Sequence, residues 1–338
     1  MSRRINRVVL SVHILICLSL SLSAQEGKLN VVATASMIAD MVYQIAGDYI
    51  ELQCIVPIGG DPHIYEATPK DAQMIAGADL LFRNGLTFEG WLNELIENAG
   101  SKAESVTVTE DIKPIESLIY QNATDPHAWM DASNGLKYIT SIKNALIKAD
   151  PANQATYQTN YENYYAELEE LDRYIMTQIQ KIPEERRILI TSHDAFQYYG
   201  RRYGIRLESV LGTSTDADIQ TSDIIRLNRV IRENGVPAVF IESTINPKIL
   251  EQLASDNHIK VGGQLYADSI GDKDSPANSY AAMLKHNTDV IVEALSAASI
   301  EEGDGAQKSK SGGNIWVYSI IVIVALSLMA LLVTRFNR

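Results

Sequence analysis

The sequence contains little cysteine, with two residues of this type among 338. Cys17 lies in an apolar run near the start of the chain, and Cys54 lies in a strand-like segment. If the first segment is removed as an export signal, no intrachain disulfide can form, because Cys54 is then the only cysteine. A chain of this length with 46% hydrophobic residues can build real cores without disulfides. We therefore expect Cys54 to be a buried structural thiol.

Basic residues are also scarce. The chain has 29 Lys and Arg against 42 Asp and Glu, which gives a formal net charge of −13 at pH 7. An export signal that contains Arg3, Arg4 and Arg7 and no acidic residue would leave −16 after its removal. Nucleic-acid-binding proteins carry basic surfaces, so this chain is a poor candidate for that class.

Three catalytic signatures are missing from the sequence. It has no G-x-x-x-x-G-K-[ST] phosphate loop, so any ATP-driven process needs a separate ATPase. It also has neither the H-E-x-x-H pair of many zinc proteases nor the G-x-S-x-G nucleophile elbow. These absences disfavour the commonest hydrolase classes.

Residues 1–24 predict an export signal, because three arginines precede the apolar run 8–22 and small residues follow it. A lipid anchor at Cys17 is the less favoured alternative. The residues directly before that cysteine, Ile14-Leu15-Ile16, lack the small residue that normally precedes a lipid-modified cysteine.

Residues 315–334 form a second apolar run, 20 residues long and without charge. This is about the length that crosses a bilayer as a helix. We expect a C-terminal transmembrane helix there, with 335–338 as a cytoplasmic tail and the glycine-rich segment 301–314 as a flexible linker. The body would then be extracytoplasmic, in a periplasm or on the outer face of the cytoplasmic membrane.

Between these segments, apolar strand-like runs alternate with helix-period segments, a pattern typical of α/β folds with parallel sheets. The strand-like runs are 29–33, 50–56, 80–82, 187–191, 206–210, 238–241 and 259–261. In the first half, helices are expected to begin at Ser36, Pro69 and Phe88. We expect two similar lobes, residues 25–153 and 183–300, each a parallel β-sheet flanked by helices.

A long helix is expected between the two lobes. Residues 155–181 contain no Gly or Pro. Their apolar and aromatic side chains recur at helical spacing, at Tyr161, Tyr164, Tyr165, Leu168, Leu171, Ile175 and Ile179. We expect one connector helix over 154–182, roughly 40 Å long, that limits movement between the lobes. Its tyrosines are interpreted as packing residues.

Three histidines lie in polar, turn-rich loops, in Asp61-Pro62-His63, Asp125-Pro126-His127 and Ser192-His193-Asp194. Asp268 lies in a fourth loop, and the four residues are 64, 66 and 75 positions apart in turn. Three imidazoles and one carboxylate form a full set of ligands for a first-row divalent metal. A single histidine of this kind more often caps or packs, but three histidines and an aspartate at matched loop positions favour a metal site.

The positions of these residues support the same interpretation. His63, His193 and Asp268 each follow a strand-like run, and open α/β sheets bind ligands at the carboxyl ends of their strands. The neighbouring acids could orient imidazole N–H groups or cap turns and helices; they are Asp61, Asp125, Asp131 and Asp194. His258 and His286 lack a comparable context and are expected at the surface.

Several stretches carry a family resemblance. They include Gly60-Asp61-Pro62-His63, Asn84-Gly85-Leu86, Asp125-Pro126-His127-Ala128-Trp129, Ser192-His193-Asp194-Ala195-Phe196, Phe240-Ile241-Glu242-Ser243 and Tyr266-Ala267-Asp268-Ser269. On these residues the chain resembles the zinc/manganese solute-binding protein family of bacterial ABC importers over nearly all of 28–300. The resemblance implies metal ligands at His63, His127, His193 and Asp268, as in the three-histidine, one-aspartate subgroup.

The resemblance implies an extracytoplasmic receptor that captures Mn²⁺ or Zn²⁺ between two lobes and delivers it to a permease with its ATPase subunit. We expect a monomer with no catalytic cofactor and no enzymatic activity. Two alternatives are a secreted metallohydrolase, with Glu66 or Glu242 as its base, and a surface adhesin with a structural metal. The absence of a histidine-rich loop favours manganese, whereas an imidazole-rich site binds zinc more tightly.

Overall fold

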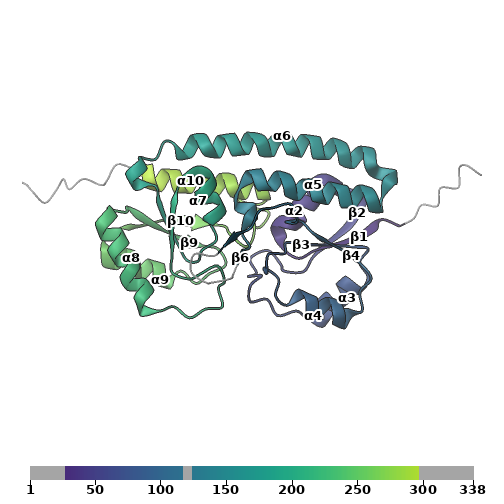
Figure 1. Ribbon diagram of the computed structural model, residues 1–338, viewed down its shortest axis with the longest axis horizontal. Coiled ribbons are helices and arrows are strands. Elements are labelled where there is room, and N and C mark those ends of the chain that lie inside the picture. The colour runs from purple at the N-terminus through teal and green to yellow at the C-terminus, as the bar shows by residue number, and fades with distance from the viewer. Residues whose placement is uncertain (1–26, 117–123, 297–338) are drawn as a thin grey trace, which may run out of the picture. The chain divides into compact units, whose positions relative to one another are not determined.

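The computed structural model describes residues 27–116 and 124–296 (Figure 1). The expected export signal (1–24), linker (301–314), transmembrane anchor (315–334) and tail (335–338) lie outside these residues. We refer to the described residues before the long helix α6 (Gln154–Ile179) as the N-terminal half, and to those after it as the C-terminal half.

The N-terminal half contains a four-stranded parallel sheet with the strand order β2-β1-β3-β4. Val31 on the inner strand β1 lies opposite Leu52 of β2 and Leu80 of β3. The strands are β1 (Leu29–Ala33), β2 (Ile50–Cys54), β3 (Leu80–Arg83) and β4 (Glu104–Thr107).

Both faces of this sheet are covered by helices, which explains why the buried positions of its inner strands, Val31 to Ala33 and Leu80 to Phe82, are all apolar. Val31 and Ala33 pack with α2 (Ser36–Ala46) and α5 (Ala132–Ala149). Val32 and Leu81, on the opposite face, pack with α3 (Pro69–Ala76) and α4 (Leu92–Ala99).

Local sequence sets where these helices begin. Helix α3 begins at Pro69, after a capping box in which Thr68 and Asp71 satisfy each other's backbone N–H groups. Helix α4 begins at Leu92, four residues later than the expected start at Phe88. Leu86 and Thr87 have φ values of 52° and 67°, so the chain forms a loop here rather than a right-handed helical turn.

The C-terminal half contains two parallel strand pairs, β7 with β8 and β9 with β10. Strands β7 and β9 are neighbours, but the hydrogen-bonded ladders described here leave the pairs as separate sheets. The elements are β7 (Ile188–Thr191), α7 (Gln197–Tyr203), β8 (Arg206–Ser209), α8 (Thr221–Asn234), β9 (Ala238–Glu242), α9 (Lys248–Asn257), β10 (Lys260–Leu265) and α10 (Tyr280–Ser296).

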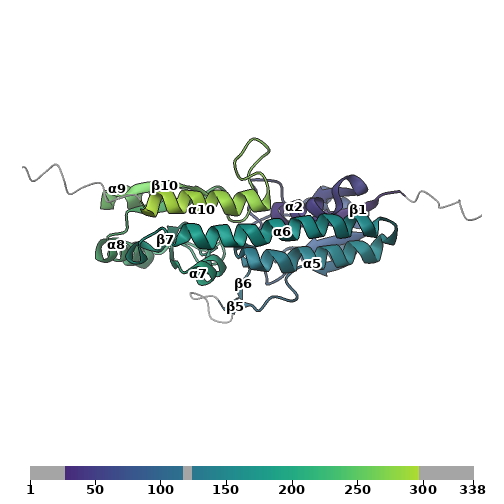
Figure 2. The ribbon, with the colours of Figure 1, turned by 90° about the horizontal axis from the view of Figure 1, so that it is seen from above.

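Helix α6 runs along both halves (Figure 1, Figure 2). It packs on α2 and α5 of the N-terminal half and on α7 and α10 of the C-terminal half. Its buried stripe consists of Tyr157, Tyr164, Leu168, Leu171, Ile175 and Ile179. These residues belong to one hydrophobic cluster that also contains Ala33 of β1 and Leu189 of β7. The two halves therefore share a continuous core.

Short elements complete the described chain. Strands β5 (Ile115–Glu116) and β6 (Thr124–Asp125) form an antiparallel pair. The 3-10 helices are η1 (Gly47–Tyr49), η2 (Ala128–Met130), η3 (Pro151–Asn153) and η4 (Glu184–Arg186).

The expected fold class is wrong in its transmembrane helix, and its two lobes are less alike than expected. Within 27–116 and 124–296, every helix is too short or too polar to cross a membrane. The longest of these helices, α6, has 26 residues but is amphipathic, with Glu162, Glu169 and Glu170 exposed. The α/β architecture with parallel strands agrees with the sequence pattern, although one half has a four-stranded sheet and the other two strand pairs.

Candidate metal centre

The structure brings together all four residues that the sequence singles out. His63, His127, His193 and Asp268 each offer one ligand atom, and these atoms lie within 4.8 Å of one another. The Nε2 atom of His127 is 3.2 Å from that of His63 and 3.3 Å from that of His193. The three imidazoles therefore turn their Nε2 atoms toward a common point.

The carboxylate of Asp268 closes this group. Its Oδ1 lies 3.2 Å from His127 Nε2, and its Oδ2 lies 3.1 Å from His193 Nε2 and 3.8 Å from His63 Nε2. Both oxygens are buried, and neither has a hydrogen-bond partner among the described residues. A buried carboxylate without a donor is costly unless a positive charge neutralises it. The three imidazole nitrogens and the carboxylate therefore fit a bound cation as its ligands.

The fold explains how distant residues meet. His193 and Asp268 lie just beyond the carboxyl ends of the parallel strands β7 and β10, and His63 lies in the loop that follows the carboxyl end of β2. His127 lies between β6 and η2. Each half of the chain thus supplies two of the four side chains.

The site is buried behind aromatic side chains. His127 and His193 are fully buried, Asp268 is 1% exposed, and the His63 side chain is 5% exposed. The Phe88 ring lies edge-on to that of His63, with 5.0 Å between centroids. The Trp129 ring lies 5.2 Å from that of His127 and donates through Nε1 to the Ala267 carbonyl. These rings exclude water and so strengthen electrostatic interactions at the site.

Two buried carboxylates contact the far sides of the histidine rings. Oδ1 of Asp125 accepts a hydrogen bond from the His127 backbone N–H at 2.9 Å and lies 2.7 Å from His127 Nδ1. Oε1 of Glu242 accepts from the His193 backbone N–H at 2.9 Å, while Oε2 lies 2.7 Å from His193 Nδ1. A proton held on Nδ1 leaves the Nε2 lone pair free to bind a metal.

The other neighbouring acids act mainly on backbone and capping groups. Asp61 accepts from the His63 backbone N–H, and Asp131 caps α5 by accepting from the Ser133 backbone N–H. Asp194 accepts from the Gln197 side chain. Of the four acids proposed from the sequence, Asp125 is thus the one that contacts an imidazole ring.

The two remaining histidines of the described chain lie outside the group. His258 ends α9 in a left-handed conformation, with φ of 55°. His286 is half-buried at the surface of α10, where its Nε2 lies 3.3 Å from the Gln264 carbonyl oxygen. Both positions agree with the surface location expected from the sequence.

Glu242 was considered from the sequence only as a catalytic base, and its contact with His193 was missed. The two residues are 49 positions apart, so spacing gave no hint of the pair. A signal did exist, because Glu242 is the last residue of strand β9. Polar residues at that end of a parallel strand point to the ligand edge of the sheet.

Burial and charge shift the pKa values of the group in opposite directions. Burial lowers the pKa of His63 to about 3. Burial also opposes protonation of His127, but the contact with Asp125 and the attraction to Asp125 and Asp268 outweigh it and raise that pKa to about 9. For Asp268, burial alone would raise the pKa, but attraction to His193 and the other imidazoles holds it well below its usual range. The carboxylate is therefore anionic at neutral pH.

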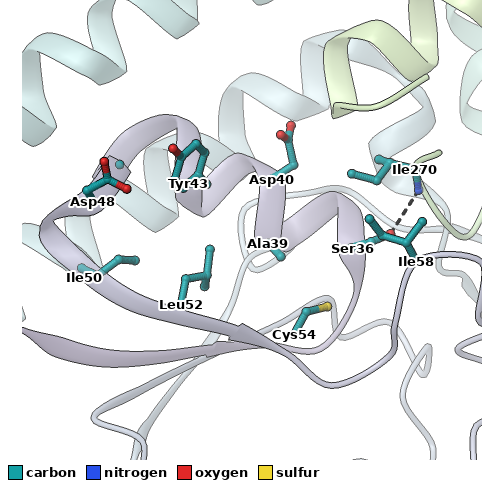
Figure 3. Close-up of a pocket in the computed structure, with 11 residues that line it drawn as sticks. Ser36, Ala39, Asp40, Tyr43, Asp48, Ile50, Leu52, Cys54, Ile58 and Ile270 are labelled. Atoms are coloured by element: carbon teal, nitrogen blue, oxygen red, sulfur yellow. Dashed lines mark hydrogen bonds between the residues drawn. The ribbon is translucent and has the colours of Figure 1, made fainter. Parts of the chain in front are cut away.

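A separate cavity of about 430 Å³ lies between α2 and β2 and contains none of the four residues (Figure 3). Its walls are mostly apolar and include Leu52 and Ile58. At one end, Ser36 Oγ accepts a hydrogen bond from the Ile270 backbone N–H at 3.1 Å (Figure 3). Ser36 Oγ also lies 3.2 Å from the Ser269 hydroxyl, next to Asp268. This end of the cavity therefore marks a contact between the two halves.

Comparison with known proteins gives a consistent result. A family model described as "Zinc-uptake complex component A periplasmic" matches residues 31–294. The chain is 34% identical over 276 residues to the manganese-binding lipoprotein MntA of Halalkalibacterium halodurans, covering 81% of this chain and 91% of that protein. It is 36% identical over 278 residues to the manganese ABC transporter substrate-binding lipoprotein PsaA of Streptococcus anginosus, covering 80% and 90%.

The fold is also similar to that of a solved structure, the periplasmic zinc binding protein TroA from Treponema pallidum. The TM-score is 0.76 at 34% sequence identity, and the match covers 80% of this chain and 99% of that one. MntA and PsaA are both named lipoproteins, which differs from the C-terminal anchor expected from this sequence.

Proposed function

Because the chain belongs to the family of the periplasmic component A of zinc-uptake complexes, we propose that it is the substrate-binding receptor of a metal-ion ABC importer. The receptor captures Mn²⁺ or Zn²⁺ outside the cytoplasm and delivers it to a permease, which a separate ATPase subunit powers. The observation that carries this proposal is the buried carboxylate of Asp268, which has no hydrogen-bond partner among the described residues and lies among three converging imidazoles.

In this proposal the four ligands of the transported ion are His63, His127, His193 and Asp268. Two observations support this assignment. The Nε2 atoms of the three histidines converge, and the carboxylates of Asp125 and Glu242 contact the far sides of the His127 and His193 rings. Three nitrogens and one oxygen suit tetrahedral zinc. If Asp268 binds through both oxygens, the site becomes five-coordinate, which suits manganese.

Membership of this family makes the chain a receptor rather than an enzyme. Four protein ligands would leave no open position for the activated water that a metallohydrolase needs. Glu242, the candidate base in that alternative, is instead engaged with His193. Glu66 is exposed.

We further propose the division of the body into metal-binding lobes 25–153 and 183–300, connected by residues 154–182. This division is supported by the positions of the candidate ligands, because two of them precede α6 in the sequence and two follow it. The export signal proposed for 1–24 would place both lobes outside the cytoplasm, where the ion is captured.

The metal content of the purified protein tests this function. The protein is exposed to equal concentrations of manganese, zinc and iron, separated from free metal and measured by mass spectrometry. We expect one equivalent of manganese or zinc in the wild type and in His286→Ala, whose histidine lies outside the site, and none in His193→Ala. A wild type without metal, or a His193→Ala variant that retains it, would contradict the proposal.

A further inference from the structure

The rigid parts of the molecule extend through both halves, so release of an ion depends on its loops. One hydrophobic cluster includes Ala33 before α6, Leu168 within it and Leu189 after it. Close-packed cores of this kind resist hinge motion. His63, in contrast, lies in the loop between β2 and α3, which contains no helix or strand over residues 55–68.

His63 is also held differently from the other two histidines. For His127 and for His193, one carboxylate accepts from the backbone N–H and has an oxygen 2.7 Å from the ring Nδ1. The carboxylate behind His63 is Asp61, and it contacts the backbone: Oδ1 accepts from the His63 N–H at 2.9 Å. His63 also has the most exposed side chain of the four residues. Its position therefore depends on how its loop is held.

The second oxygen of Asp61 reaches the other half of the chain. Asp61 Oδ2 accepts a hydrogen bond from the Thr215 hydroxyl at 2.6 Å, across 154 positions in sequence. Thr215 lies in the segment between β8 and α8, which has no regular structure over residues 210–220. One carboxylate thus connects the backbone of His63 to a loop of the C-terminal half.

This connection can open without disturbing the core. Thr215 and Asp61 are both only partly buried, so water can replace their hydrogen bond. The loop of His63 has a second contact with the C-terminal half, from the Gly59 N–H to Ser269 Oγ at 2.8 Å, but Ser269 is fully buried. Of these two contacts, the Asp61–Thr215 bond is therefore the easier to break.

We propose that Asp61 and Thr215 are positioning residues that form a latch over His63 and set how long the ion stays bound. While the hydrogen bond is intact, His63 remains beside the other three side chains. When the bond breaks, the loop of His63 loses a contact with the C-terminal half, and the ion loses its most exposed ligand first. This inference rests on the proposed function.

The test is the rate at which Zn²⁺ leaves the purified full-length protein when it is mixed with an excess of a chromophoric chelator. Thr215→Val removes the hydroxyl and keeps the shape of the side chain. We expect its dissociation rate to rise about tenfold, because a hydrogen bond to a charged group is worth about 1.4 kcal/mol or more and this one is partly solvated. The association rate should not change.

Two matched variants separate the latch from a general loss of structure. Thr215→Ser restores the hydroxyl and should release Zn²⁺ within about twofold of the wild-type rate, on the same hydrogen-bond argument. Ser214→Ala removes a neighbouring hydroxyl and should behave as the wild type. If Thr215→Val lowers the melting temperature of the metal-free protein, Thr215→Ala provides the same comparison, because it removes the same hydroxyl and leaves Asp61 in place.

Each outcome has a distinct meaning. Faster release from Thr215→Val, with rescue by serine, supports the latch. Release at the wild-type rate, or a change confined to association, overturns the latch while the proposed function stands. A wild-type protein that binds no Zn²⁺ and no Mn²⁺ overturns the proposed function and the latch with it.

Discussion

Glu242 holds His193 at two points, accepting a hydrogen bond from its backbone N–H at 2.9 Å through Oε1 and lying 2.7 Å from its ring Nδ1 through Oε2. Both residues are buried. These two contacts orient the imidazole ring so that its Nε2 points toward the other candidate ligands. Glu242 therefore acts on the site without being placed to touch the ion.

Glu242→Gln should weaken metal binding about 10- to 100-fold, the usual cost of losing an acid that orients a ligand histidine. The neutral amide no longer attracts the Nδ1 proton as strongly, so the ring is a weaker and less well-oriented donor. Competition titration of Zn²⁺ against a chelator of known affinity measures the change. Glu251→Gln, on the exposed face of α9, is the control and should bind as the wild type does. Equal affinities for the two variants would refute this role of Glu242.

Removing the metal should lower the melting temperature by several degrees. An ion that binds the folded state alone stabilises it by about 4 kcal/mol when it is present at about 1,000 times its dissociation constant. Calorimetric scans with saturating Mn²⁺ and with EDTA measure the difference. The His193→Ala variant should show the same melting temperature in both conditions. An equal metal effect in that variant would show that the stabilising ion binds elsewhere.

The Cys54 thiol should react slowly with alkylating reagents. Burial raises its pKa to about 12, and its Sγ donates to the Val56 carbonyl at 3.1 Å. At pH 8.5 a free cysteine is about half thiolate, whereas this one is almost entirely protonated, so labelling should be more than about 100-fold slower than in the unfolded chain. Iodoacetamide labelling of a Cys17→Ser variant, native and in guanidinium chloride, measures the ratio. Equal rates would show that the thiol is accessible.

Thr87→Gly should stabilise the protein by about 1 kcal/mol. Thr87 is exposed and has a φ of 67°, a left-handed conformation that costs a β-branched residue about 1–2 kcal/mol and costs glycine little. The greater flexibility of glycine in the unfolded chain offsets part of the gain. Urea unfolding at pH 7 measures the change. Thr177→Gly, within helix α6, is the opposite control and should destabilise. A destabilised Thr87→Gly would mean that the threonine side chain makes a favourable contact that outweighs the strain.

The positions of the four candidate ligands could be predicted from local sequence. His63 and His127 each follow an Asp-Pro pair, and His193 and Asp268 follow apolar runs that end in polar residues. Such signals are local, because a strand and the loop after it are contiguous in sequence. The partnership of Glu242 with His193 is not local, since it depends on β7 and β9 being neighbours. Pairings between distant strands leave no mark in a single sequence.

Parts of the fold were missed for similar reasons. Helix α5 contains Gly135 and several polar residues, which weakens its helical pattern, yet its buried face completes the core beneath α6. Strand β4 is half-exposed at the edge of its sheet and lacks a continuous apolar run. Both are specified by the surfaces that they cover rather than by their own composition. The separation of the C-terminal strands into two pairs likewise depends on long-range geometry.

The shared core beneath α6 has a consequence for how such a receptor could diverge. Since Asp61 and Thr215 are only partly buried and lie in loops outside that core, substitutions at these two positions leave folding largely untouched. The time for which an ion is retained can therefore drift or be selected separately from stability. A lineage could adapt to scarcer or more abundant metal by changing a few surface residues while keeping its scaffold and its four ligands.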